Sequence, residues 1–493
     1  MRVILAGFNV DIEALQEYKN GKVILTPESI SAAYARISRS PKSVDGLRKE
    51  ARKEVEKARR SNRAIIFEMG HHSVAEHAVF NFDIIGISRR AVEELEKFRL
   101  CSYTEKSQRY VTLKGDFVIP EELKGTDLIN EYTDMIKVQN DFYKTLFEKI
   151  RECNLKKFPD LAKDKRGKRL LENLAKEDAR YILSMATQTQ LGATINARNL
   201  ELMMRRFASH NLKEINELGK KFYSLIKKIA PSIILFYKAN NYDKKTYREL
   251  QEYAAQHIRI SGDQGIRNDD VKLVDYSQDG DDKILASILF RVKKFDYSEC
   301  VRLVKKMSKK EKIELFKKSL QHMELYDVTL REFEFANLTY SLKVSAACFG
   351  QLKRHRVATM TCQEYDPNIG FTIPDSVKEV GEEKRFVKII NKTEKVYHKI
   401  EEKVGNIGSY ILTNAHHKKV LLSVNLRELY HISRLREDPT AQWDIRNKAQ
   451  KMSKLAKRVM PITAQLLGGK NDYPKIYFKL FGKNPKVTKT PQP

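Results

Sequence analysis

The chain has 493 residues, which is too long for one ordinary core, so two domains of roughly 200 to 250 residues are expected. A hydrophobic content of 41%, with 22 Tyr and 22 Phe, is enough to bury two cores and excludes intrinsic disorder. No run of 18 apolar residues exists and the start has no signal-peptide pattern, so we predict a cytoplasmic protein without a membrane partner.

The formal net charge of +28 favours anionic partners, either nucleic acid or small anions such as nucleotides and phosphates. Lys and Arg are mixed with Glu along the whole chain, so solvated helix faces explain much of this charge equally well. The five cysteines lie far apart and form no CxxC pair, which predicts reduced thiols and gives no template for a metal site.

The first half begins with two short predicted strands, at residues 1–8 and 22–26. Thr26, Pro27 and Glu28 then have the pattern of a helix start, and helical spacing continues to about Phe67. Residues 78–88 alternate and are rich in β-branched side chains, which predicts a strand. Helical spacing resumes at Arg90.

Apolar residues recur at helical spacing between Phe117 and Tyr181 and again from Asn199 to Ala239, and residues 238–256 predict a polar helix. The Gly- and Asp-rich loop at 261–270 marks the expected boundary. We therefore predict a first domain at 1–265, a second at 266–481 and a basic flexible tail at 482–493.

The second half repeats landmarks of the first in the same order. Residues 271–290 predict a strand, a turn and a helix, and 332–344 predict the strand before the second motif. The motif KFRLCSYTEKSQRY at 97–110 aligns with RHRVATMTCQEYDP at 354–367. Similar helices close the halves, at 195–207 and 424–436. Three matched landmarks predict a duplicated chain.

Both motifs carry residues suited to binding anions. Arg354, His355 and Arg356 place two guanidinium groups and an imidazole together, and Arg presents a fork of donors that matches phosphate or carboxylate. Surface charge explains one such triplet equally well. Glu105, Ser107 and Arg109 alternate, which would put them on one side of an extended segment, where they could hold the polar face of a pyrimidine nucleotide.

The closing helices add the pairs Asn196 with Arg198 and Asn425 with Arg427. Each pair alone is typical of an ordinary helix start.

Together these landmarks resemble the flavin-dependent thymidylate synthases, whose signature is Arg-His-Arg, seven residues and Ser. The second copy has the triplet but Glu364 at the Ser position, and the first has Ser107 but Lys97-Phe98-Arg99 for the triplet. The segment His71–His77 and the late Asn-x-Arg helices extend the resemblance over most of both halves. The implied fold class is α+β, with two tandem domains that each contain a mostly antiparallel sheet and packed helices.

The resemblance implies roles for individual residues. The implied catalytic residues are Arg436, for the charge that develops on uracil, and Ser107. The implied contacts to the nucleotide are Gln351, Arg354, Glu105, Ser107, Gln108, Arg109 and Arg180. The implied contacts to the flavin are Arg354, His355, Arg356, Asn425, Arg427, His431, His71, Ser73, Asn196 and Arg198.

Each half has lost what the other keeps. The second half has Cys362, Glu364 and Asp366 at the positions of Glu105, Ser107 and Arg109, and Ser409 at the position of Arg180. The first half has Phe207 at the position of Arg436, and Glu94 at that of Gln351. Since family sites form between subunits, the two halves are predicted to form one composite active site, with its symmetry mate inactive.

The resemblance implies reductive methylation of dUMP to dTMP with FAD as cofactor, and methylenetetrahydrofolate and NADPH as co-substrates. It also implies a homodimer, in which four domains would reproduce the tetramer of the family. Two alternatives remain: flavin-dependent modification of another uridine nucleotide or of a uridine in nucleic acid, and a non-catalytic descendant that binds nucleic acid. Nucleic acid is the less favoured partner.

Overall fold

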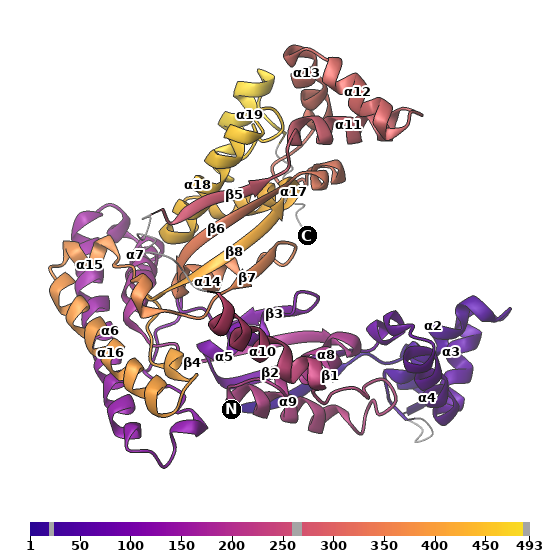
Figure 1. The fold of residues 1–493 in the computed structure, drawn as a ribbon, viewed down its shortest axis with the longest axis horizontal. Coiled ribbons are helices and arrows are strands. Elements are labelled where there is room, and N and C mark those ends of the chain that lie inside the picture. The colour runs from indigo at the N-terminus through magenta and orange to yellow at the C-terminus, as the bar shows by residue number, and fades with distance from the viewer. Residues whose placement is uncertain (19–23, 259–268, 487–493) are drawn as a thin grey trace. The chain divides into compact units, whose positions relative to one another are not determined.

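A computed structural model describes residues 1–18, 24–258 and 269–486. The chain forms two compact units (Figure 1). Unit 1 comprises Met1–Asp263 and Ile373–Thr413, and unit 2 comprises Gln264–Thr372 and Asn414–Pro493. Each unit therefore contains a segment from a distant part of the sequence.

Each unit contains one antiparallel sheet of four strands in the described part of the chain. In unit 1 the order is β1-β2-β4-β3, and in unit 2 it is β5-β6-β8-β7. The strands are β1 Arg2–Phe8, β2 Val79–Ser88, β3 Ser102–Glu105, β4 Gln188–Asn196, β5 Val271–Tyr276, β6 Asn337–Ser345, β7 Thr359–Cys362 and β8 His417–Asn425. The same strand order in both sheets confirms the α+β class and fits the predicted duplication.

Helices flank both sheets. Those of unit 1 are α1 Ile12–Tyr18, α2 Glu28–Arg36, α3 Val44–Lys53, α4 Val55–Arg63, α5 Arg89–Leu95, α6 Leu128–Lys157, α7 Lys165–Ala179, α8 Ala197–Phe207, α9 Lys213–Ile226, α10 Asn241–His257, α15 Asp375–Glu379 and α16 Glu383–Lys403. Those of unit 2 are α11 Gly280–Val292, α12 Tyr297–Lys306, α13 Lys309–Leu320, α14 Ala346–Leu352, α17 Leu426–Arg436, α18 Trp443–Val459 and α19 Tyr473–Phe481. No helix of the described residues is long and apolar enough to cross a membrane.

Most predicted elements are confirmed, with three corrections. Residues 24–26 are not a strand, and residues 22 and 23 lie outside the described ranges. The helical series expected from Phe117 begins only at Leu128, because Pro120 cannot donate a backbone hydrogen bond and Gly125 has φ of +80°. The series expected to Ala239 ends at Ile226, ahead of Pro231.

Two other predicted segments are only partly described. Of the boundary loop at 261–270, residues 261–268 lie outside the described ranges, as do residues 487–493 of the predicted tail. Cys101, Cys300 and Cys348 are buried, and Cys153 and Cys362 are half-buried.

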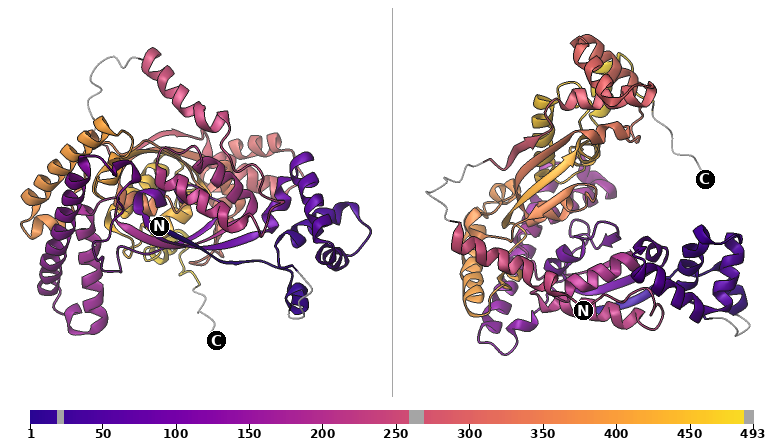
Figure 2. Two further views of the ribbon diagram at one scale, coloured as in Figure 1. Left: turned by 90° about the horizontal axis from the view of Figure 1, so that it is seen from below. Right: turned by 45° about the vertical axis from the view of Figure 1, so that its right-hand side comes forward.

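The long helix of the second half packs in unit 1. Figures 1 and 2 show α16 beside α6. Gln139 Nε2 donates to Thr393 Oγ1 at 2.9 Å and to the carbonyl of Ile411 at 3.1 Å. The rings of Phe142 and Phe386 meet edge to face at 6.3 Å. Residues of the second half thus complete the core of unit 1.

The core of unit 2 lies between its sheet and the helices α17 and α18. On β6 the alternating residues Leu338, Tyr340, Leu342 and Val344 are buried in this core. Tyr340 donates its hydroxyl to the carbonyl of Met452 on α18 at 3.0 Å. Burial of this apolar face fixes the register of β6 and with it the position of α14, which follows directly.

Candidate active site

Both motifs follow a short helix that is held in the same way. Ser88 Oγ accepts from the backbone N–H of Ala91 at 3.0 Å and donates to Glu214 at 2.6 Å. Ser345 caps α14 equally and donates to Asp444 Oδ2 at 2.6 Å. The helices α5 and α14 are therefore equivalent supports for the two motifs.

In unit 2 the predicted catalytic arginine is held by two hydrogen bonds. Arg436 Nε donates to His355 Nε2 at 2.9 Å, and Arg436 Nη2 donates to the carbonyl of Gln351 at 3.1 Å. With Glu428, whose Oε1 lies 3.6 Å from His355 Nδ1, these residues form what we call the arginine–histidine cluster. The cluster joins three residues that the resemblance named and one that it did not.

His355 is neutral in this setting. Burial lowers its pKa well below the usual value, and the charges of Arg436 and His431 lower it further. Its side chain is buried, whereas the neighbouring Arg354 and Arg356 are exposed. The triplet therefore keeps its imidazole inside, between two exposed residues.

Gln351 has a buried side-chain oxygen that lacks a hydrogen-bond partner among the described residues. Its Nε2 lies 3.5 Å from Oε1 of Gln442, which itself accepts from the backbone N–H groups of Asp444 and Ile445 at the start of α18. A buried amide oxygen without a partner costs free energy, so this atom is suited to accept from a ligand.

Unit 1 has an apolar contact at the positions of the His355–Arg436 pair. Phe98 and Phe207 meet edge to face, with ring centroids 5.7 Å apart. Phe207 is fully buried. The position of Gln351 is taken by Glu94, whose pKa is lowered well below its usual value: burial opposes this shift, but Arg90, His210 and Lys97 outweigh it. This half has replaced a polar pair by an aromatic pair.

The predicted nucleotide residues of unit 1 are brought together by salt bridges. Arg89 pairs with Glu105, and Arg109 pairs with Glu177. Arg180 Nε donates to the carbonyl of Glu177 at 3.1 Å. We call these five residues the nucleotide cluster. Burial lowers the pKa of Arg180, and Arg89 and Arg109 lower it further although Glu177 opposes them, so three guanidinium groups lie near one another.

The extended conformation expected for residues 105–109 is wrong. Strand β3 ends at Glu105, where its pairing with Leu191 stops, and residues 108–110 form a turn. Ser107 Oγ accepts from the backbone N–H of Arg109 at 3.1 Å, which stabilises that turn, and Gln108 is buried. Ser107 and Arg109 thus extend from a turn.

The Asn-x-Arg pairs have structural contacts in both units. Asn196 and Asn425 cap α8 and α17 with side-chain oxygens that accept from backbone N–H groups. Arg198 pairs with Glu76, and Arg427 Nη1 pairs with Glu334 at 2.9 Å. These arginines therefore link the closing helix of each half to the segment before its second strand.

The remaining predicted flavin residues, His71, Ser73 and His431, are exposed. His431 meets the ring of His355 edge to face at 5.8 Å, and the flavin roles of all three residues stay predictions.

Sequence reasoning missed Arg89, Glu177, Glu428 and Gln442. Glu177 lies one helical turn before Arg180, which is a detectable spacing for a local contact. The partners of Arg89 and Glu428 lie 16 or more residues away, so no local pattern identifies them.

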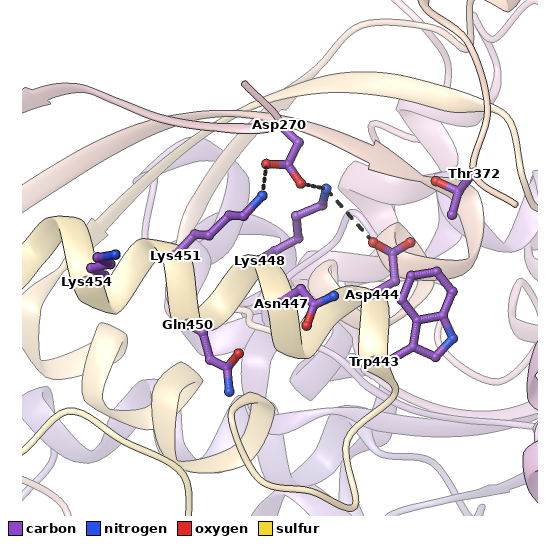
Figure 3. A pocket seen from close by; sticks show the side chains of 9 residues that line it. All are labelled: Asp270, Thr372, Trp443, Asp444, Asn447, Lys448, Gln450, Lys451 and Lys454. Atoms are coloured by element: carbon purple, nitrogen blue, oxygen red, sulfur yellow. Dashed lines mark hydrogen bonds and ion pairs between the residues drawn. The ribbon is translucent and has the colours of Figure 1, made fainter. Parts of the chain in front are cut away.

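A pocket of about 400 Å³ opens on α18 and contains none of the predicted site residues (Figure 3). Its lining is Asp270, Thr372, Trp443, Asp444, Asn447, Lys448, Gln450, Lys451 and Lys454. Lys448 and Lys451 both pair with Asp270. Burial alone would raise the pKa of Asp270, but these two lysines lower it. The ion pairs tie α18 to the residue before β5.

One contact in unit 1 joins the motif helix of the first half to a residue of the second. Arg90 Nε on α5 donates to Ser409 Oγ at 3.0 Å. Ser409 is the counterpart of Arg180 in the aligned halves. The residue of the second half that aligns with Arg180 thus contacts the helix before the first motif.

Comparison with known proteins gives two family segments and full-length relatives. Residues 22–232 and 272–462 each match the family described as thymidylate synthase complementing protein. A UPF0159 protein of Thermoplasma acidophilum is 25% identical over 458 residues, which cover 84% of this chain and 89% of the relative. A flavin-dependent thymidylate synthase of Geobacter sulfurreducens is 30% identical over 212 residues, 42% of this chain and 80% of the relative.

Among solved structures, a UMP/dUMP methylase, PolB from Streptomyces cacaoi, is 17% identical with a TM-score of 0.33, over 47% of this chain and 92% of its own. The ThyX of Helicobacter pylori with FAD and dUMP is 20% identical with a TM-score of 0.28, over 48% of this chain and 99% of its own. Because the two matched family segments cover most of the chain, one in each half, the protein belongs to the thymidylate synthase complementing protein family and carries its domain twice.

Proposed function

We propose that the chain is an FAD-dependent enzyme that reductively methylates a uracil nucleotide, dUMP, to dTMP. Methylenetetrahydrofolate would supply the carbon and NADPH the reducing equivalents. The observation that carries the proposal is the division of polar residues between the halves. The pair His355–Arg436 is hydrogen-bonded in unit 2, and the aromatic pair Phe98–Phe207 is in contact at the same positions of unit 1.

The nucleotide cluster suits a phosphate monoester. Three guanidinium groups and two carboxylates give it a formal charge of about +1 before the nucleotide binds. Buried arginines bind phosphate through charge-assisted hydrogen bonds that are stronger than neutral ones. We assign the phosphate to Arg109 and Arg180 and the sugar to Glu105, with Ser107 and Gln108 as further donors or acceptors.

The arginine–histidine cluster suits the uracil ring. A guanidinium group that is already oriented stabilises negative charge on the ring oxygens and nitrogen without reorganisation. We assign this role to Arg436, and we assign the contact to the base to Gln351, whose buried oxygen lacks a partner within residues 1–18, 24–258 and 269–486.

The triplet fits a flavin nucleotide by its donor set. Arg354 and Arg356 are exposed residues on either side of the buried His355 in the sequence, and their guanidinium groups are suitable donors for a diphosphate. When bound, FAD supplies the hydride chemistry that protein side chains cannot perform. Arg354 would also contact the nucleotide.

We further propose that residues of both halves serve one active site per chain. The contact of Arg90 with Ser409 supports this, because it gives one example in which the second half supplies a site position to the first motif. Decay without selection would not keep the nucleotide residues in one half and Arg436 in the other. We also propose a homodimer, whose test is the molar mass in solution.

The experiment measures bound flavin and turnover with the purified full-length chain. Yellow protein that releases FAD on denaturation, and conversion of dUMP to dTMP with methylenetetrahydrofolate and NADPH, are expected. Arg436→Ala and Ser107→Ala should each abolish turnover, and Glu364→Ala, at the Ser position of the second copy, is the matched control with near-normal turnover. Colourless protein that stays inactive after FAD addition refutes the proposal.

Two further arms address the alternatives. UMP and uridine-containing RNA replace dUMP in the assay, and faster turnover of either one reassigns the substrate. Mixing the Arg436→Ala and Ser107→Ala chains tests the composite site. No recovery is expected if one chain supplies both residues, whereas recovered activity shows that the residues come from different chains.

A further inference from the structure

We propose that Glu428 is a positioning residue of the active site. Its carboxylate holds the His355 ring in one orientation and one tautomer, and that ring fixes the guanidinium group of Arg436. The inference rests on the function proposed above, in which Arg436 acts on the uracil ring, and it adds a residue that the resemblance does not name.

The first step is the protonation of His355. A guanidinium group carries only donors, so Nε2 of His355 must accept from Arg436 Nε, from which it lies 2.9 Å away. His355 is therefore neutral with its proton on Nδ1. Burial and the nearby charge of Arg436 act in the same direction, because both disfavour a second proton on the ring.

The second step is the partner of that Nδ1 proton. Glu428 Oε1 lies 3.6 Å from Nδ1, and both side chains are buried, with 2% and 8% of their surface exposed. The backbone N–H of Glu428 donates to Asn425 Oδ1 at 2.8 Å, which fixes the residue in the first turn of α17. His431 on the same helix meets the ring of His355 edge to face at 5.8 Å. Glu428 Oε1 thus faces Nδ1 at a separation slightly longer than a hydrogen bond, and His431 packs against the ring.

The first half serves as an internal comparison. In aligned order the counterparts of Glu428, His355 and Arg436 are Asn199, Phe98 and Phe207. Asn199 donates its side-chain amide to Asn196 Oδ1 at 2.8 Å, so it bonds to the cap of its own helix. The half that lacks the imidazole and the guanidinium therefore also lacks the carboxylate. This is expected if the three residues act as one unit.

The consequence concerns turnover more than binding. Two hydrogen bonds, to His355 and to the carbonyl of Gln351, define the plane of the Arg436 guanidinium before substrate arrives. Loss of the carboxylate would let the imidazole rotate or change tautomer, and an Nε2–H would then oppose the Arg436 donor. Supporting residues of this kind typically change activity by about 10- to 100-fold.

The kinetic test compares Glu428→Ala, Glu428→Gln and Leu435→Ala in the full chain. We expect Glu428→Ala to lower kcat about 10- to 100-fold with little change in KM for dUMP. Glu428→Gln should recover most of this loss, because an amide oxygen also accepts from Nδ1–H. Leu435 is exposed on the same helix, so its variant should behave as the wild type. Equal loss in the Ala and Gln variants overturns the proposal.

A spectroscopic test does not depend on activity. ¹⁵N-histidine labelling, with the His355 signals assigned from a His355→Gln spectrum, reports which ring nitrogen is protonated. The wild type should show an Nδ1–H imidazole at position 355, and Glu428→Ala should show a shift toward Nε2–H or a mixture. An unchanged Nδ1–H tautomer in Glu428→Ala refutes the positioning role even if the protein turns over dUMP. Failure of all turnover with the expected tautomer change refutes only the proposed reaction.

Discussion

The aromatic pair of unit 1 gives a test of whether the aligned positions 98 and 207 form a coupled pair. The perturbation places the residues of the second half at these positions. It consists of the single variants Phe207→Arg and Phe98→His and of the double variant. In unit 2 the same two residue types share a hydrogen bond of 2.9 Å. If the two positions are coupled through one contact, the double variant should unfold less readily than the single changes predict.

The magnitudes follow from burial. Phe207 is fully enclosed, so an arginine there places a guanidinium without an acceptor beside Phe98, at a cost of about 4 kcal/mol. Phe98 is half-buried, and Phe98→His alone loses mainly the edge-to-face contact, about 1 kcal/mol. In the double variant a hydrogen bond to a charged group returns about 2 kcal/mol. The expected cost is therefore about 3 kcal/mol instead of about 5.

Hydrogen exchange measured by mass spectrometry is the suitable assay, because a chain with two units need not unfold in two states. Peptides from α8 report the change, and peptides from α17 serve as the internal reference. Leu202→Arg is the matched control, since Leu202 is exposed on α8 and should change the opening free energy by no more than about 0.5 kcal/mol. Opening free energies that add within about 0.5 kcal/mol for Phe98→His and Phe207→Arg would refute the coupling.

Two further predictions concern carboxylates of unit 1, the half-buried Glu201 and the buried Glu214. Burial raises the pKa of Glu201, whose Oε1 accepts from the backbone of Phe236, to about 7. In the folded state the carboxyl group of Glu201 therefore stays protonated to a higher pH than in the unfolded chain. Its contribution to the free energy of unfolding is complete below pH 4.5 and falls by about 3 kcal/mol as the pH rises to 7. Glu201→Gln should remove this fall in the opening free energy of α8 peptides, measured by hydrogen exchange at several pH values, and an unchanged dependence on pH contradicts the assignment. Glu214 accepts from the backbone N–H and the Oγ of Ser88 and from the hydroxyl of Tyr410, at 2.6–2.9 Å. We expect Glu214→Ala to lower the opening free energy of α9 by about 4 kcal/mol in hydrogen exchange. A loss below about 1 kcal/mol would show that these bonds contribute little.

Strands β1, β2, β5 and β6 and the duplication could be predicted from the sequence because their signals are local, whereas β4 and β8 are not among the predicted strands. Alternation in β2 and β6, and the capping Asn before α8, depend on neighbours within a few residues. The turn after β3 could not be predicted in this way. Its residues continue an alternating pattern, but the pairing of β3 with β4 stops at Glu105 and Leu191, although β4 itself begins at Gln188.

The packing of 373–413 in unit 1 has no local signal either. Apolar residues recur at helical spacing in α16, but this pattern does not identify the partner of the helix, because many helices of the chain have the same spacing. The contact between Gln139 and Thr393 joins residues 254 positions apart. The packing of α16 on α6 depends on contacts between side chains that lie far apart in the sequence.

The sequence could predict which positions belong to the candidate site, but it could not predict which of these residues contact one another. Alignment of the halves identified Phe98 and Phe207 as the replacements of His355 and Arg436, but it gave no reason why both changed. The structure supplies one, since the two residues of each pair touch. A single change would leave either a buried guanidinium without an acceptor or an imidazole without a donor, and each intermediate costs free energy. Positions linked in this way diverge together, and the same reasoning extends to Glu428, whose first-half counterpart Asn199 bonds elsewhere. The second half therefore keeps the whole contact network around Arg436, and the first half has lost all of it.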